Sequence, residues 1–254
     1  MRTPFAALLL ALGCAALSAS TQDGTPRTSG STVPDRLGLA VGHHFTVSFE
    51  GPQQSDLAAR ALDALDRAYW RVGDTLNSFP ADPVPVVLYT TEEFRDITRA
   101  PGWAAGAYDG TIRIPMRGAL DRQEELDRVL AHEFTHALIR SLAPRNVPTW
   151  INEGIAAALE RESLDWASDL VKKAGGPAPL AALTRSFGRL SGQQAELAYA
   201  TSALAARSLL DANGGVAMSN LLRDLGHGEP IAPAFEHRMN ESLEQFSARF
   251  RSTY

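Results

Sequence analysis

The sequence predicts an α+β domain, in which a small mixed sheet with helices is followed by a mostly helical part. Apolar runs at residues 45–49, 84–89 and 111–115 are typical of strands, because they alternate or are short and continuous. Helical apolar spacing separates the first two runs, and from residue 164 onward helical patterns follow one another. With 254 residues, 44% of them hydrophobic, the chain can bury the core of such a domain.

Residues 1–20 have the pattern of an export signal. One positive charge, Arg2, precedes an almost wholly apolar run at residues 5–17, and small residues follow. The run is too short for a stable membrane span. We therefore expect a periplasmic or extracellular protein, whose residues 21–36, rich in Thr, Ser, Gly and Pro, form a flexible leader.

The only cysteine, Cys14, lies within the apolar run of this signal. Its context, Ala11-Leu12-Gly13-Cys14, leaves two interpretations open: a lipid-anchored N-terminus, or an apolar residue of a signal that is removed. In either case the mature protein has no disulfide.

The N-terminal part of the domain, residues 37–145, begins with an alternating strand at residues 45–49. His43 and His44 precede it. Since neighbouring side chains of a strand point to opposite faces, we expect two surface histidines and no shared metal. An apolar stripe at residues 55–79 then predicts a long amphipathic helix.

The next elements are shorter. Residues 84–89 predict a buried strand, and residues 91–98 a short helix that ends at a Pro-Gly pair. Residues 103–116 predict a β-hairpin around Asp109-Gly110, a strong turn dipeptide.

A pair of histidines then lies within a predicted helix that runs to about Leu142. His132 and His136 are four residues apart, so their imidazoles point the same way and both can reach one ion at roughly 2.0–2.1 Å. Glu133 sits beside that position, where a carboxylate can take a proton from the attacking water. The alternative is that both histidines merely pack or cap a buried helix.

A second helix follows two prolines, Pro144 and Pro148, and we expect Thr149 to be its N-cap. Glu153 then falls in its first or second turn, and a reversal between the helices can bring its carboxylate to the two histidines. Two histidines and one glutamate leave the fourth position of a tetrahedral zinc open, as in catalytic sites. The alternative for Glu153 is a favourable interaction with the helix dipole alone.

The segments His132-Glu133-Phe134-Thr135-His136 and Trp150-Ile151-Asn152-Glu153-Gly154-Ile155-Ala156 resemble the gluzincin metallopeptidases, and among them the small bacterial peptidase MA-like domains. The resemblance implies a zincin-like fold, one Zn²⁺ held by His132, His136 and Glu153, and Glu133 as general base. It also implies that a peptide substrate lies along an edge strand at residues 111–115, the alternative being an ordinary strand without a substrate.

The sequence departs from this resemblance at one position. Some gluzincins have an aspartate four residues after the glutamate ligand, where it orients a histidine; here that residue is Ala157. Partners that fix the imidazole tautomers must therefore come from elsewhere, such as backbone carbonyls.

The C-terminal part of the domain, residues 146–254, is predicted to be helical beyond the metal motif. Helical patterns cover residues 164–174, 180–190, 196–210, 216–225 and 243–250, and glycines interrupt them, as in Asn213-Gly214-Gly215. Tyr199 is the candidate donor to the oxyanion of the tetrahedral intermediate. The alternatives are a tyrosine that only packs, or a donor role for His227 or His237.

The formal net charge is −5, and no basic stripe is present, so we expect no nucleic acid partner. The resemblance implies a peptide or protein substrate. The sequence thus predicts an exported zinc metallopeptidase with a domain at residues 37–254. Two alternatives remain: a non-catalytic zincin-fold module that binds a protein or cell-wall partner, and a metal hydrolase that acts on a non-peptide amide.

Overall fold

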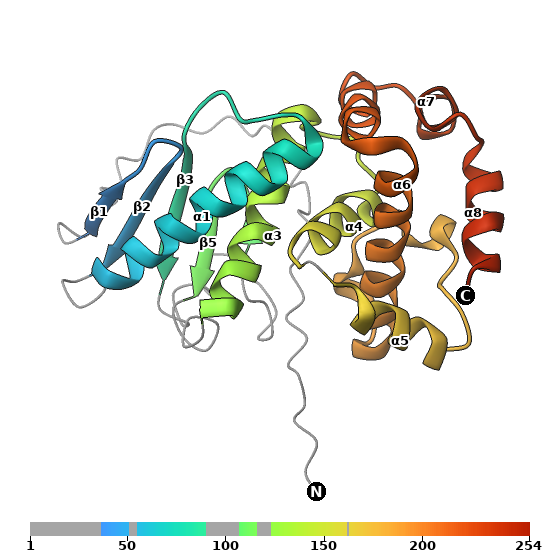
Figure 1. Cartoon of the computed structure of the whole chain (residues 1–254), viewed down its shortest axis with the longest axis horizontal. Coiled ribbons are helices and arrows are strands. Elements are labelled where there is room, and N and C mark those ends of the chain that lie inside the picture. The colour runs from blue at the N-terminus through green and yellow to red at the C-terminus, as the bar shows by residue number, and fades with distance from the viewer. Residues whose placement is uncertain (1–36, 51–54, 90–106, 116–122, 162) are drawn as a thin grey trace, which may run out of the picture.

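The computed structural model describes residues 37–50, 55–89, 107–115, 123–161 and 163–254. Its fold is α+β, as predicted. Figure 1 shows a sheet with two long helices, α1 (Ser55–Leu76) and α3 (Gln123–Leu142), on one side of the molecule and the remaining helices on the other. Helix α3 carries the two histidines and contacts both sides, so the metal motif lies where they meet.

The sheet is mixed and has five strands within the described residues, in the spatial order β1-β2-β3-β5-β4. The pairs β1–β2 and β5–β4 are antiparallel, and the pairs β2–β3 and β3–β5 are parallel. The strands are β1 (Leu37–Val41), β2 (Phe45–Glu50), β3 (Val84–Tyr89), β4 (Ala107–Tyr108) and β5 (Ile112–Pro115).

The hairpin around Asp109-Gly110 is confirmed over the described part of residues 103–116. Its turn joins β4 to β5, and Gly110 has a φ of 113°, which favours glycine. The expectation that residues 111–115 form the edge strand is wrong, because β5 pairs with β3 on one side and β4 on the other. Among the described strands, β4 is therefore the one at the edge of the sheet that contacts α3.

The core of the N-terminal part lies between the sheet and helices α1 and α3. Phe45 of β2, Tyr69 of α1 and Phe134 of α3 meet there; the ring of Phe134 is 5.4 Å from that of Phe45 and 5.7 Å from that of Tyr69. Phe134 lies between the two histidines in sequence. Because it anchors one face of α3 in this core, the opposite face, with His132 and His136, turns toward the C-terminal helices.

The C-terminal part is helical, and its first helix, α4, packs closely against the long helix α6. The helices are α4 (Thr149–Leu159), α5 (Asp165–Lys173), α6 (Gly192–Gly226), α7 (Ile231–Met239) and α8 (Leu243–Ser252), and the 3₁₀ turns are η2 (Leu180–Leu183) and η3 (Phe187–Arg189). The break expected at residues 213–215 is a kink inside α6, at Gly214 (φ 76°).

Two local predictions in this part are wrong, and one helix was not predicted. Residues 180–190 form only the two 3₁₀ turns, since the Ser186 hydroxyl accepts the backbone N–H of Gly188 and starts a separate turn. Thr149 is the first helical residue and not the N-cap, which is Pro148; its hydroxyl donates to the Thr184 carbonyl instead. Helix α7 was not predicted; its Pro233 lies in the first turn, where proline is tolerated.

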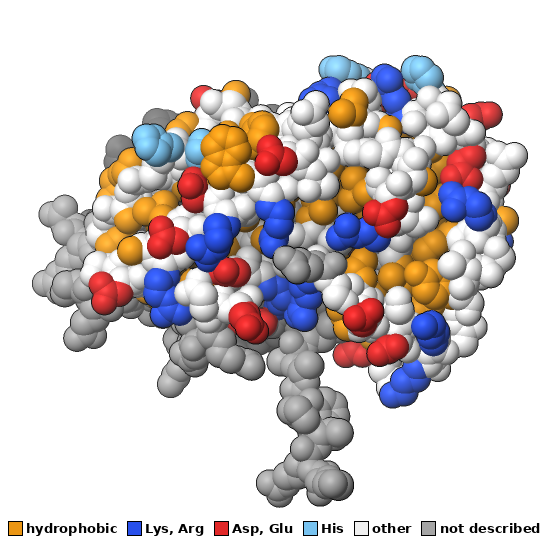
Figure 2. Space-filling model, viewed as in Figure 1, with side chains coloured by type: hydrophobic (Ala, Val, Ile, Leu, Met, Phe, Trp, Pro, Cys, Tyr) orange, Lys and Arg blue, Asp and Glu red, His pale blue; other side chains and the backbone are white. Residues whose placement is uncertain are grey.

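The predicted export signal, the leader at residues 21–36, Cys14 and the short helix at residues 91–98 lie outside the described residues. Within the described part of the chain, no helix has both the length and the apolar character that crossing a membrane requires. On the face shown in Figure 2, acidic and basic side chains are interspersed and do not gather by sign.

Candidate metal centre

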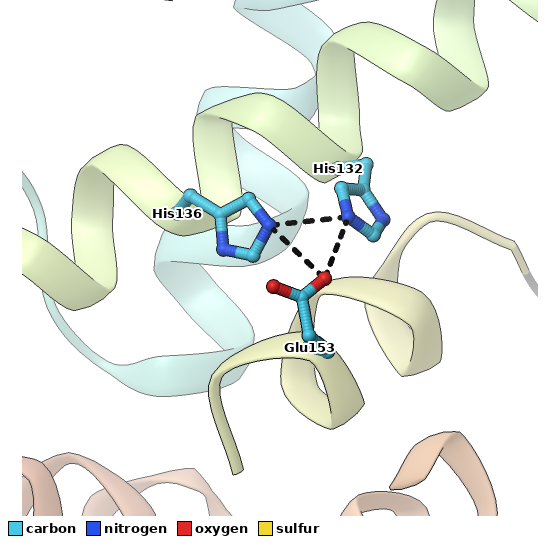
Figure 3. Close-up of side chains that lie close together, drawn as sticks. All are labelled: His132, His136 and Glu153. Carbon is cyan, nitrogen blue, oxygen red and sulfur yellow. Dashed lines mark hydrogen bonds and ion pairs between the residues drawn. The ribbon is translucent and has the colours of Figure 1, made fainter. Parts of the chain in front are cut away.

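The three predicted metal ligands converge in the structure. His132 and His136 extend from α3, and Glu153 extends toward them from the second turn of α4 (Figure 3). The two Nε2 atoms are 3.1 Å apart, and Oε2 of Glu153 lies 3.7 Å from Nε2 of His132 and 3.6 Å from Nε2 of His136. All three side chains are buried. The structure therefore assembles a group that could hold a metal ion.

The spacing of these donor atoms fits one small divalent cation. Two ligands of a tetrahedral zinc, each about 2.1 Å from the metal, are roughly 3.4 Å apart. The three observed separations lie on either side of that value. From these separations, the centre of the triangle is about 2.0 Å from each donor atom, close to a zinc–ligand bond length. Two imidazole nitrogens and one carboxylate oxygen also suit zinc chemically.

Without a cation, the ligands interact as charged groups. Burial lowers the pKa of His132, but the carboxylates of Glu153, Glu160 and Glu133 outweigh this effect and raise it to about 10. Burial raises the pKa of Glu153, but His136 and His132 lower it to about 2. Hydrogen bonds with Glu153 and Glu160 are the largest causes that raise the pKa of His132, and the charge of His136 is the largest cause that lowers the pKa of Glu153. His132 and Glu153 therefore stabilise each other's charged form.

His132 is held by a buried carboxylate that the sequence analysis missed. Oε2 of Glu160 lies 2.6 Å from Nδ1 of His132 and accepts a hydrogen bond from it, which leaves Nε2 directed at the centre of the cluster. Glu160 is the C-cap residue of α4, two helical turns after Glu153, so both carboxylates lie on the same face of the helix. The partner of His132 comes from a position other than 157, as expected, but it is a side-chain carboxylate and not a backbone carbonyl.

His136 also has a side-chain partner. Oδ1 of Asn152 lies 3.3 Å from Nδ1 of His136 and accepts a hydrogen bond from it, so here too Nε2 faces the centre. The Asn152 amide also donates to Oε1 of Glu153 at 3.5 Å. One amide thus links a histidine and the carboxylate, and its position directly before Glu153 is a signal that the sequence contained.

Glu133 lies beside the three ligands and is fully buried. Neither of its carboxylate oxygens has a hydrogen-bond partner among the described residues. Burial raises its pKa, and the charges of His136 and His132 lower it in part, which shows how close Glu133 is to the cluster. A buried, unpaired carboxylate is costly, and such groups occur mainly where they act on a ligand or substrate.

Tyr199 of α6 reaches the same cluster. Its side chain is buried, and its ring packs edge-on against Phe187 at 5.1 Å. Burial raises the pKa of its hydroxyl well above the usual value, and so do the charges of Glu153 and Glu133 and a hydrogen bond with Glu153. The structure therefore places the candidate donor next to the metal ligands, as a neutral phenol.

The other candidate histidines lie elsewhere. His227 and His237 are both exposed, and their charges act on Asp224 in the C-terminal part. His43 is exposed, and the half-buried ring of His44 stacks on Tyr69 at 3.7 Å. None of the four belongs to the group that could hold a metal.

Comparison of the sequence with protein-family models found no match, and comparison with curated proteins found none. The function is therefore argued from the geometry of the cluster itself.

Proposed function

We propose that this protein is an exported zinc-dependent peptidase of the gluzincin type, with a zincin-like fold. The observation that carries the proposal is the triangle of donor atoms from His132, His136 and Glu153, with the unpaired carboxylate of Glu133 beside it. A structural zinc site needs four protein ligands and no neighbouring base. Three ligands and a free carboxylate instead match the requirements of metal-assisted hydrolysis.

A zinc ion held by these three residues would polarise the scissile carbonyl and lower the pKa of a water at the open position. The chain supplies the proton transfers. Glu133, whose pKa is raised, is suited to take a proton from the attacking water and to deliver it to the leaving nitrogen.

Tyr199 is the proposed donor to the oxyanion that forms when water attacks the carbonyl. Its raised pKa keeps the phenol protonated, as a hydrogen-bond donor must be. It comes from α6, whereas Glu133 comes from α3, so the two groups approach the cluster from different helices.

An extended peptide is the substrate that suits the surroundings best. Among the described residues, strand β4 lies at an edge of the sheet next to α3, and an edge strand can bind a peptide through main-chain hydrogen bonds without reading its sequence.

A non-catalytic binding module is the alternative from a different class. Such a module would gain nothing from a buried carboxylate without a partner, since the group lowers stability. The buried Glu133 carboxylate, which has no hydrogen-bond partner among the described residues, therefore favours the enzyme over the binding module.

The test is the replacement of Glu133 by Gln, a change that keeps side-chain size and removes the base. We expect E133Q to bind zinc with the same stoichiometry as the parent and to lose peptide hydrolysis by at least about 10²-fold, as expected for loss of a general base. Cleavage of an unbiased peptide library and elemental analysis measure the two quantities. The matched control is E124Q, an exposed glutamate of the same helix, which should change neither.

Two results would count against the proposal. Cleavage by E133Q at the parent rate would remove the assigned base. A parent protein that binds zinc yet cleaves no peptide of the library would favour the binding module.

A further inference from the structure

The carboxylate that orients His132 is itself held by a buried arginine. Arg128 lies one helical turn before His132 on α3, and only 6% of its side chain is exposed. Its Nη1 donates to Oε1 of Glu160 at 3.1 Å, and its Nη2 donates to Oε1 of Glu125 at 2.5 Å. Arg128 and His132 thus hold the two oxygens of one carboxylate between them.

Glu160 lies where a carboxylate is electrostatically unfavourable. It is the C-cap residue of α4, at the negative end of the helix dipole, and the carboxylates of Glu153 and Glu133 are close to the same histidine. A buried carboxylate in this position needs a cation next to it. Arg128 is a buried, permanently charged cation in contact with it, beside the His132 ring on its other oxygen.

A second arginine also approaches Glu160, but it contributes much less. Nε of Arg161 lies 3.5 Å from Oε1 of Glu160, and 40% of the Arg161 side chain is exposed. An ion pair at that exposure is screened by water and contributes little. The two arginines therefore form a natural comparison: both face the same oxygen, and only one of them is buried.

We propose that Arg128 is a positioning residue of the metal centre: by fixing the Glu160 carboxylate, it holds the His132 ring with Nε2 directed at the metal. The inference rests on the proposed function only in taking His132 as a metal ligand. The contacts form a closed loop, from Arg128 to Glu160 on α4 and back to His132 on α3. If the Arg128 contact is lost, Glu160 can turn away from its carboxylate neighbours, and the imidazole can rotate.

The experiment measures zinc binding by the purified full chain, through competition with a chelator, together with the rate of zinc release. We expect R128M and E160Q each to weaken zinc affinity by about 10- to 100-fold, the range that is typical when the partner of a metal-bound histidine is removed. The double variant should bind zinc no less tightly than the single variant with the lower zinc affinity, because both changes break the same loop of contacts.

The matched control is R161M, which removes the exposed arginine from the same carboxylate and should change zinc affinity by no more than a few-fold. A second readout is the visible spectrum of the Co²⁺-loaded protein, which reports ligand geometry. We expect that spectrum to change in R128M and to match the parent in R161M.

A purely structural role for Arg128 gives a different result. R128M would then unfold more easily without metal, yet bind zinc as tightly and release it as slowly as the parent, and this outcome would overturn the inference. An equal loss of affinity in R161M would overturn it too. If R128M does not fold, R128K decides, with R161K as its control, because lysine keeps the charge but lacks the rigid planar fork of donors that arginine presents to the two carboxylates. Weaker zinc binding by R128K supports the inference, and equal binding refutes it.

The failure of this inference can be told apart from that of the proposed function. A parent protein that binds neither Zn²⁺ nor Co²⁺ would end both. A parent that binds zinc and hydrolyses peptides, with R128M and R128K indistinguishable from it, would end only the role of Arg128.

Discussion

Two carboxylates at the cluster have different environments although both are fully buried. The pKa of Glu153 is lowered by the adjacent histidines, whereas the pKa of Glu133 is raised by burial because it has no partner among the described residues. Groups of one chemical kind whose pKa values are driven apart are typical of active sites. At the scale of single residues, this difference supports a ligand role for Glu153 and a base role for Glu133.

The pair of His132 and Glu153 makes the stability of the metal-free protein depend on pH. The pKa of His132 is raised from 6.5 to about 10, so its contribution is complete below pH 6.5 and is lost as pH rises through about 10. The pKa of Glu153 is lowered from 4.5 to about 2, so its contribution is complete above pH 4.5 and is lost as pH falls through about 2. We expect the contribution of this pair to be greatest between pH 4.5 and 6.5.

Urea unfolding of the chelator-treated protein at about pH 5.5 and about pH 9 checks this dependence, with H132Q as the control that should lose most of it. Zinc affinity should change in the opposite direction and increase with pH above 6.5, because the metal needs an unprotonated imidazole. An equal pH dependence in H132Q and the parent would show that other groups dominate.

The hydroxyl of Tyr199 tests the assignment of the oxyanion donor. We expect Y199F to lower kcat by about 10²- to 10³-fold, since one preorganised donor contributes that much, with KM nearly unchanged. Steady-state kinetics on one peptide measures both constants. Y69F, which removes the hydroxyl of a tyrosine in the core of the N-terminal part, is the control. An unchanged kcat in Y199F would limit this residue to packing and to its contact with Glu153.

At the scale of elements, the position of Glu153 depends on the close approach of α4 to α6. A Cβ at Gly154 would stand 2.4 Å from the backbone oxygen of Ser202, which cannot move aside as a flexible side chain would. We expect G154A to destabilise the protein by about 1–3 kcal/mol and, by displacing α4, to weaken zinc binding.

Denaturant unfolding and chelator competition measure these two effects of G154A. The control is G192A, at the start of α6, where a Cβ would meet no atom within 4 Å. It should be neutral or slightly stabilising, since alanine costs less conformational entropy than glycine in a helix. Full zinc affinity in G154A would mean that α4 tolerates displacement.

At the scale of the whole molecule, a metal at this position would connect the two parts of the fold. Two ligands come from α3, which packs on the sheet, and the third comes from α4, which packs on the C-terminal helices. Zinc at 1,000 times its dissociation constant would stabilise the folded state by about 4 kcal/mol. For a domain of this size, chelation should then lower Tm by roughly 8–16 °C.

A thermal scan with and without chelator tests this connection. E153A is the control, because it lacks the ligand on α4 and should show little response to either zinc or chelator. If neither zinc nor chelator changes the Tm of the parent protein, the site binds no metal tightly enough to stabilise the fold.

Several features of the fold and of the site could be predicted from local sequence patterns. The apolar periodicity and the turn residues predicted the α+β class, the strands β2, β3 and β5, and the helices α1 and α3, and the four-residue spacing of His132 and His136 placed them on one face of α3. The edge strand was assigned wrongly, because strand order depends on pairing between distant segments, which no local pattern reports.

The sequence by itself identified the three residues that could share a metal and the glutamate proposed as base. The four-residue spacing fixed the histidine pair, and the family resemblance added Glu153 and the role of Glu133. Only the tertiary structure decided what holds them: Glu160 on His132, Asn152 on His136 and Arg128 on Glu160. Hydrogen bonds between α3 and α4 depend on how the two helices pack. That packing arises from the summed burial of many side chains, and no short stretch of sequence contains it.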